Sequence, residues 1–245
     1  MSRRPTARGN RRGALGGGFF PPSAIAGCVA FWDASRGLVL SGANVTTAAD
    51  QAPGGVADTL TGKSGLEPQF VASDGGWPAF DCASGRYFTC PDSADISPTT
   101  NLSLCCWVKR NATGVDHTFV SQRTAGQVRM LFGVESSNKL YLDDGNANFT
   151  QSGVVSTDTA WHHCAVTYNG GAAAASRVVF YYDGVVSAAG TFGAASLPDT
   201  TSPLQVGMFN SASWPLNGRI DSIGYWNRTL SAAEIVAVKG YHPHA

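Results

Sequence analysis

The segment from residue 102 to residue 110 constrains the fold most, because it is apolar on both faces of a β-strand. Successive side chains of a strand point to opposite faces, so Cys105 and Trp107 lie on the face opposite Cys106. A strand that is apolar on both faces must be covered on both sides. The sequence therefore predicts two packed layers with this strand in a central position.

Short strand-like segments, separated by turn residues, follow one another along the chain. The 29 Gly, the 12 Pro and the low share of charged residues, 14%, suit this organisation. Strands are predicted at residues 28–33, 78–82, 86–90, 102–110, 117–122, 128–134, 139–143, 161–168, 177–182 and 185–186. Asp183-Gly184 favours a two-residue hairpin turn between the last two. Residues 35–76 are predicted to be mainly loop.

One short helix is predicted near the end of the chain. Ser231 and Glu234 have the spacing of a capping box, in which each side chain accepts a hydrogen bond from the backbone N–H of the other. Leu230 and Ile235 fit the hydrophobic staple that accompanies such a box. The helix is predicted to end at about Lys239, in a chain that otherwise consists of strands.

Five segments resemble the laminin-G-like jelly-roll family, a branch of the concanavalin A-like lectin and glucanase superfamily. They are residues 80–93, 102–109, 161–168, 180–184 and 218–235. The resemblance implies an all-β fold, a two-sheet antiparallel jelly-roll sandwich with one short C-terminal helix. We assign residues 23–241 to this domain, residues 1–22 to a basic arm rich in Gly and Arg, and residues 242–245 to a tail.

The charges of the chain are unevenly distributed, although they sum to zero. Residues 1–22 hold five of the 17 basic residues and none of the 17 acidic ones, which leaves 12 basic against 17 acidic residues in the rest. Such an arm suits docking onto an acidic surface, and a tail that is merely kept solvated has the same composition. The arm and the segment 21–33 resemble the start of many phage structural proteins, which implies a virion component whose arm contacts capsid or appendage proteins.

No catalytic residue is predicted. The glucanases of the superfamily carry carboxylates at alternating positions of one strand, because one must protonate and another attack. In this chain none of the glutamates, Glu67, Glu135 and Glu234, has an acid two residues on. No motif for a nucleophile elbow, a phosphate loop, a zinc protease or a dinucleotide site occurs. His162 and His163 point to opposite faces of a strand, so they do not chelate one ion.

Glycan binding needs a flat aromatic side chain beside planar polar groups. Trp214 and Asn217, in the loop 210–217, offer this combination. Trp77 is a second candidate. Asp143 and Asp144 form a polar rim loop with Asn146 and Asn148. The alternative for each of these tryptophans is packing against a sheet edge. Three further tryptophans are predicted to be core residues: Trp107, Trp161 and Trp226.

A structural calcium ion is the one cofactor that the sequence suggests. Proteins that this chain resembles use an aspartate at the position of Asp221 for structural calcium, and Asp33 and Asp50 are candidates for further ligands. Calcium takes roughly six to eight oxygen ligands, so backbone carbonyls next to these aspartates would have to complete the site. The alternative is a hydrogen bond from Arg219 or the backbone to Asp221 without a metal.

The six cysteines form neither a metal-site nor a disulfide-scaffold spacing and are predicted to be buried, reduced thiols, typical of a reducing cytoplasm. The sequence predicts no membrane span and no specific nucleic-acid site. Exposed sandwich edges favour a homo-oligomer or a multicopy protein.

We expect a non-catalytic, virion-associated decoration or appendage protein, made in a host cytoplasm, whose lectin-like jelly roll recognises a cell-surface glycan or a protein. The alternatives are a free carbohydrate-binding or adhesion module, located in the cytoplasm or at a cell surface, and a degenerate glycoside hydrolase.

Overall fold

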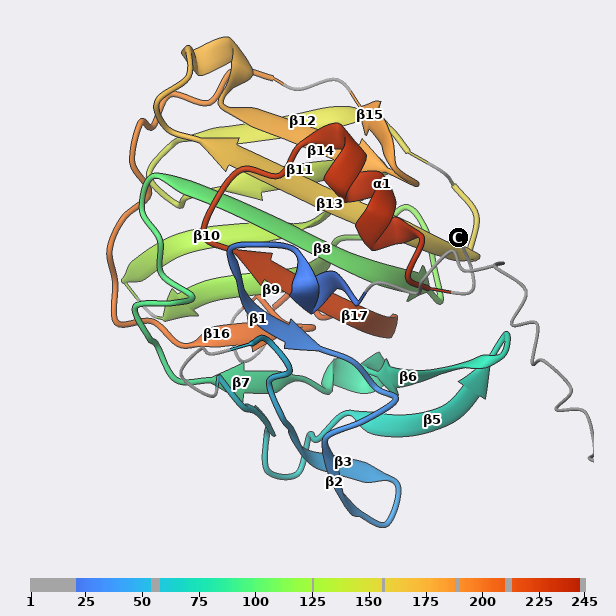
Figure 1. The fold of residues 1–245 in the computed structure, drawn as a ribbon. Coiled ribbons are helices and arrows are strands. Elements are labelled where there is room, and N and C mark those ends of the chain that lie inside the picture. The colour runs from blue at the N-terminus through green and yellow to red at the C-terminus, as the bar shows by residue number, and fades with distance from the viewer. Residues whose placement is uncertain are drawn as a thin grey trace, which may run out of the picture.

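The computed structural model describes residues 21–53, 58–124, 126–155, 157–187, 190–209 and 213–242. Within these ranges the chain folds into one antiparallel β-sandwich with a single α-helix (Figure 1). Most of the predicted arm and residues 243–245 of the predicted tail lie outside the described residues. Pro22, which was assigned to the arm, and His242, which was assigned to the tail, are both buried in the domain.

The first layer of the sandwich is built around β8 (Asn101–Arg110), the strand that is apolar on both faces. Its strands run in the order β15, β14, β13, β8, β17, and the second half of β17 pairs with β1 while its first half pairs with β6. The bounds of these strands are Val185–Ser187 for β15, Val178–Tyr182 for β14, Trp161–Asn169 for β13, Gly218–Trp226 for β17, Cys28–Trp32 for β1 and Trp77–Asp81 for β6.

The second layer contains seven strands among the described residues, in the order β4, β7, β16, β9, β10, β11, β12. Their bounds are Leu60–Gly62, Phe88–Cys90, Leu204–Val206, His117–Thr124, Gln127–Val134, Lys139–Asp143 and Phe149–Val154. The strands β2 (Leu38–Ser41), β3 (Asn44–Ala48) and β5 (Gln69–Asp74) connect the two layers at one side of the molecule (Figure 1).

The main core lies between the two layers, and a second apolar cluster lies on the outer face of the first layer. Cys106 belongs to the main core, whereas Cys105 packs in the second cluster beneath helix α1 (Ala232–Lys239). Figure 1 shows α1 lying across β13 and β14. Both faces of β8 are therefore covered, as the sequence predicted. All six cysteines are buried and unpaired, as expected.

The predicted hairpin and the predicted helix start are both confirmed. Asp183 and Gly184 adopt φ angles of 51° and 78° between β14 and β15, as a two-residue turn of this kind requires. Ser231 caps α1 through a complete capping box with Glu234. No helix in the described parts of the chain is long and apolar enough to cross a membrane.

The interpretation of residues 35–76 as mainly loop was wrong. This segment contains the strands β2, β3, β4 and β5, and β12 and β16 were also missed. These strands are short. β5 and β12 carry polar or small side chains instead of a clear apolar alternation, and β2 is apolar but mostly exposed. Their pairing with neighbouring strands, which the sequence does not reveal, holds them in place.

Candidate functional site

Trp214 lies at a pocket on the outer face of the second layer, on the side away from the main core. Strand alternation places Phe132 and Leu140 in the core, so Leu131 and Tyr141 point outward. The pocket has a volume of about 90 Å³. We call it the open pocket, and its lining residues are Asp116, Glu135, Tyr141, Asp143, Phe149 and Trp214.

Tyr141 forms the floor of the open pocket. Its side chain is 3% exposed, and its hydroxyl lies 3.3 Å from the hydroxyl of Thr118. Gly133 faces Tyr141 on the neighbouring strand β10, and a Cβ atom there would lie 3.0 Å from the tyrosine ring. The glycine thus leaves room for the ring to lie close to the strand. Burial raises the pKa of Tyr141, so the phenol stays neutral and can donate a hydrogen bond.

Trp214 and Phe149 are the exposed aromatic side chains of the open pocket. They are 46% and 43% exposed, respectively. Phe149 stacks on Tyr141 with a centroid distance of 6.0 Å, and Trp214 lies 4.6 Å from the ring of Phe209. The guanidinium of Arg123 covers the Phe209 ring at 4.0 Å. Two apolar faces therefore remain open to a ligand while neighbouring side chains support them.

The backbone of Trp214 is strained. Its φ angle is 48°, in the left-handed region that a bulky side chain rarely adopts. Its carbonyl accepts a hydrogen bond from the Thr118 amide at 3.1 Å, which ties the loop to β9. Strain of this kind persists where the surrounding structure imposes it, and it is concentrated at binding sites. The conformation presents the indole at the pocket instead of burying it.

Three carboxylates complete the open pocket. Asp116 accepts a hydrogen bond from the Ser136 amide at 2.8 Å, and Asp143 accepts one from the Gly145 amide at 2.6 Å. Burial raises the pKa of Asp143. Burial also raises the pKa of Glu135, and the charge of Asp116 adds to this effect. The carboxylates are thus fixed hydrogen-bond acceptors beside two exposed aromatic faces.

Asp144 and Asn146, two predicted ligand residues, belong to the turn that borders the open pocket and do not line it. Asp144 is buried, and its carboxylate accepts hydrogen bonds from the Asn146 amide at 2.8 Å and from the Asn148 side chain at 2.8 Å. This network closes the turn between β11 and β12. Asp143 and Phe149, which are paired across the two strands, are held opposite each other as a result.

Asn217 is exposed but does not line the open pocket. Its side-chain oxygen accepts a hydrogen bond from the Asn111 amide group at 3.2 Å, and its backbone N–H donates to Nδ1 of His117 at 3.2 Å. Residues 210–212 of the same predicted loop lie outside the described residues. The structure therefore brings Trp214, but not Asn217, to the pocket.

Trp77 lies far from this pocket in the fold, in an aromatic cluster on the outer face of the first layer. It is half-buried, and the rings of Trp77, Trp107 and Trp161 surround the imidazole of His242 with centroid distances of 5.4, 4.8 and 5.7 Å. Asp221 lies against the same imidazole, with 3.5 Å between its Oδ2 and Nε2 of His242. We call these four residues the His242 cage. The chain itself fills this cage.

The three aspartates that were predicted to bind calcium do not form a common ligand group. Asp221 is fully buried and accepts hydrogen bonds from the amide of Ala34 and the indole of Trp77, both at 2.7 Å. Asp33 accepts from the hydroxyl of Tyr241 at 2.6 Å, and Asp50 from the amide of Phe31 at 2.9 Å. Each of these carboxylates accepts hydrogen bonds from the protein, and calcium binding by them stays a prediction.

Within the described ranges no group of three or more His, Cys, Asp or Glu side chains is placed to hold a metal ion. Arg219, the alternative partner proposed for Asp221, forms ion pairs with Asp74 and Asp81 instead. Burial raises the pKa of Asp221, and the nearby charge of Asp33 adds to this, while His242 lowers it. Asp221 thus acts as a buried hydrogen-bond acceptor that organises the His242 cage.

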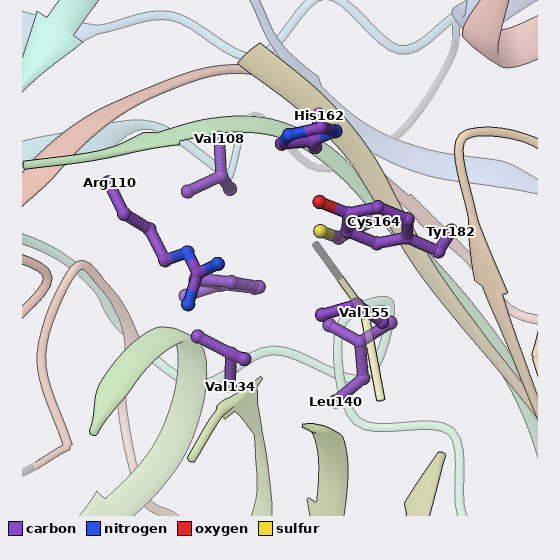
Figure 2. Close-up of a pocket in the computed structure, with 9 residues that line it drawn as sticks. Val108, Arg110, Val134, Leu140, Val155, His162, Cys164 and Tyr182 are labelled. Carbon is purple, nitrogen blue, oxygen red and sulfur yellow. The ribbon is translucent and has the colours of Figure 1, made fainter. Parts of the chain in front are cut away.

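A second, smaller cavity lies between the layers at one end of β13 (Figure 2). Its volume is about 10 Å³, the size of a single water site, and most of its lining is apolar. His162 lies at its edge, stacked on Tyr182, and each of its ring nitrogens lies 2.8 Å from a carboxylate oxygen, of Asp183 and Asp158. His163 is buried on the opposite face, as the sequence predicted. This cavity is too small for a ligand larger than water.

Comparison with known proteins decides the family. The family model for concanavalin A-like lectins and glucanases, of the laminin-G type, matches residues 83–236, more than half of the chain. The chain belongs to the concanavalin A-like lectin/glucanase superfamily. No curated protein matches the sequence of this chain.

Solved structures share the fold of this superfamily member at low sequence identity. Domain 4 of an extracellular arabinanase from Geobacillus stearothermophilus, solved in complex with arabinotriose, matches with a TM-score of 0.63 and 16% identity over 86% of this chain and 98% of that domain. Botulinum neurotoxin type C, whose cell entry depends on interaction with two ganglioside molecules, matches with a TM-score of 0.64 and 10% identity over 87% of this chain and 51% of the toxin chain. A Trypanosoma rangeli sialidase matches with a TM-score of 0.55 and 15% identity over 87% of this chain and 32% of the enzyme chain.

Sequence reasoning named Trp214 and, within the polar rim loop, Asp143, and it missed the other four residues that line the pocket of this domain. Phe149 begins β12, a strand whose polar composition hid it, and Tyr141 was placed on a strand without being assigned to the outer face. The usable signal was the alternation in residues 139–143, where Leu140 and Leu142 point inward, so that Tyr141 and Asp143 point outward. Asp116 and Glu135 reach the site from turns next to β9 and β10, which only the fold brings together.

Proposed function

We propose that this protein is a non-catalytic carbohydrate-binding domain and that the open pocket is its sugar site. The observation that carries the proposal is the convergence of two exposed aromatic faces, those of Trp214 and Phe149, with three carboxylates around one cavity. Sugars present apolar C–H faces that pack on aromatic rings, and hydroxyl groups that donate to carboxylates. A concave site with aromatic walls and a few fixed polar groups is the usual form of a small-ligand site.

The superfamily membership supports this proposal without identifying the sugar. The arabinanase domain was solved with a saccharide, and the neurotoxin interacts with ganglioside molecules. Identities of 16% and 10% support a shared fold and leave the ligand of this chain open. The ligand must therefore be found from the chemistry of the open pocket.

The non-catalytic part of the proposal is supported by the missing glucanase carboxylate pattern. Asp116 and Asp143 each accept a backbone N–H from a neighbouring turn, which suits acceptors of sugar hydroxyls. An assay for hydrolysis of the bound saccharide tests this part. We expect no turnover, and turnover that disappears in Glu135→Gln would identify the protein as a glycoside hydrolase.

Calorimetric titration of the full chain with saccharides selected on a glycan array tests the binding function. We expect Trp214→Ala and Phe149→Ala each to weaken binding at least about tenfold, since truncation of an aromatic anchor costs about 1.4 kcal/mol or more. Val185→Ala is the matched control, because Val185 is exposed on β15 of the other layer. The assignment of the site would be contradicted if all three variants weakened saccharide binding equally. It would also be contradicted if Trp214→Ala left the saccharide affinity unchanged.

We propose further that the domain is a virion component, with its basic arm attached to capsid or appendage proteins and its open pocket turned outward. Support comes from the charge separation between residues 1–22 and the rest of the chain. Deletion of residues 2–20, which spares the buried Pro22, tests it. We expect the truncated protein to keep its saccharide affinity and to lose incorporation into particles, whereas unchanged incorporation would contradict the role of the arm.

A further inference from the structure

We infer that the open pocket selects a cationic sugar, a saccharide with a free amino group, over neutral and acidic sugars. This inference rests on the proposed carbohydrate-binding function and specifies its ligand class. Three observations support it: the charge of the lining, the position of the neighbouring cations, and the exposure of the aromatic faces.

The lining of the open pocket is acidic. It contains Asp116, Glu135 and Asp143, and no Lys or Arg occurs among the described residues that line it. The charge of Asp116 disfavours ionisation of Glu135, so these carboxylates repel one another across the cavity. A ligand ammonium would relieve that repulsion and donate hydrogen bonds to the same oxygens.

Two cations, Arg123 and Lys139, act on these carboxylates from outside the lining of the pocket. Arg123 lies over Phe209, and the ring of Phe209 in turn packs against Trp214, so the guanidinium is held behind the aromatic wall. Arg123 favours ionisation of Asp143, and Lys139 favours ionisation of Glu135. Both cations therefore help to keep the carboxylates charged, and neither lines the cavity.

The aromatic walls suit a cation as well as a sugar face. The faces of aromatic rings carry partial negative charge, so an ammonium within about 6 Å of a ring centroid is attracted to it. Trp214 and Phe149 are each more than two-fifths exposed, and they share the cavity with the carboxylates. An amino sugar matches both the aromatic walls and the carboxylates, because its ring can pack on an aromatic face while its ammonium group lies at the acidic lining. A carboxylated sugar meets like charge instead.

The test compares three oligosaccharides of equal length and linkage that differ at C2: oligomers of glucosamine, of N-acetylglucosamine and of glucose. Calorimetric titration of the full chain should show the glucosamine oligomer binding at least about tenfold more tightly than the other two, with a preference that falls as salt increases. Glu135→Gln and Asp143→Asn should weaken binding of the glucosamine oligomer more than binding of the two neutral oligomers, so that the preference falls. Asp199→Asn, which removes one charge from an exposed loop, is the matched control.

The outcomes separate the two proposals. Equal affinities for the three oligomers, with binding that depends on Trp214, would overturn the selection of a cation and leave the carbohydrate-binding function in place. A lack of binding to these oligomers and to every member of a glycan array would overturn both. Loss of the preference in Asp199→Asn as well as in Glu135→Gln would show that net charge, and not the open pocket, causes it.

Discussion

The open pocket and the His242 cage combine the same kinds of side chain and differ in what fills them. Each brings tryptophan next to carboxylate, with Trp214 near Asp143 in the pocket and Trp107 next to Asp221 across the strands β8 and β17 in the cage. The cage is filled by His242, which is 1% exposed and stacks on Trp107 at 4.8 Å. The open pocket has about 90 Å³ of space.

The difference shows that tryptophan and carboxylate side chains can stabilise a β-sandwich in one region and line an open pocket in another. In the His242 cage the aromatic rings close around a side chain of the same molecule, so their burial contributes to stability. In the open pocket Trp214 is held in a strained conformation with its ring exposed, so its contribution to stability is small.

The largest expected effect is on the stability of the cage. Trp107 is 1% exposed, so Trp107→Ala should lower the free energy of unfolding by about 3–5 kcal/mol. Trp214→Ala should change it by less than about 1 kcal/mol, because exposed positions contribute little. Urea denaturation of the two variants measures both values. If both variants lost a similar free energy of unfolding, the His242 cage would contribute no more to stability than the open pocket does.

Acid should destabilise the cage through His163, which packs edge-on against Trp107 at 5.7 Å. Burial lowers the pKa of His163 to about 3. The unfolded chain binds this proton near pH 6.5 and the folded chain near pH 3, so stability falls as the pH drops between these values, by at most about 1.4 kcal/mol per pH unit. Urea denaturation at pH 7 and pH 5 should show a smaller loss in His163→Leu, and an unchanged loss would contradict this cause.

His162 provides the contrast on the opposite face of β13. Burial favours a lower pKa for His162, but its hydrogen bonds to Asp183 and Asp158 outweigh burial and raise the pKa. The stabilisation from these contacts is complete below the ordinary value, about 6.5, and is lost as the pH rises through the raised value. His162→Gln should therefore remove a stabilisation that is largest at low pH, opposite in sign to the effect of His163.

These two histidines also show what the sequence could predict. Strand alternation placed His162 and His163 on opposite faces, and it placed Cys105 and Cys106 correctly as well. A pattern of period two follows directly from backbone geometry, so it can be read from one strand alone. The hairpin at Asp183 and the cap at Ser231 were predictable for the same reason, since their signals lie within a few residues.

The open pocket was not predictable in this way. Trp214 was identified from its loop, but Tyr141 and Phe149 reach the pocket from two paired strands, and Asp116 from a third part of the chain. The neighbours of a residue across a sheet depend on register and layer packing, which the sequence of a single chain does not give. For the same reason Trp77 was proposed as a ligand residue although it donates to Asp221 inside the domain.

A smaller effect is expected at Asp221, which was predicted to bind calcium. Asp221→Asn removes a charged acceptor from the donors of Ala34 and Trp77 and should cost about 1–3 kcal/mol in the free energy of unfolding. Because those donors occupy the carboxylate, a calcium chelator should leave the Tm of the native protein unchanged. A rise in Tm on addition of calcium that is lost in Asp221→Asn would support the calcium prediction.

The smallest expected effect concerns the strain at Trp214. Glycine adopts a φ of 48° without steric cost, so Trp214→Gly should raise the free energy of unfolding by up to about 1 kcal/mol while it abolishes saccharide binding. Thermal denaturation and calorimetric titration of the same preparation measure the two effects. If Trp214→Gly lowered the free energy of unfolding, the packing of the indole would stabilise the fold by more than the strained φ angle of Trp214 destabilises it.

The most direct test of the central claim is a nuclear magnetic resonance titration that follows the indole N–H signals of the six tryptophans as the glucosamine oligomer is added. The account predicts that the signal of Trp214 shifts in a saturable manner, while those of Trp77, Trp107 and Trp161 stay in place. Shifts confined to the tryptophans of the His242 cage, or saturable binding without a change at Trp214, would contradict it.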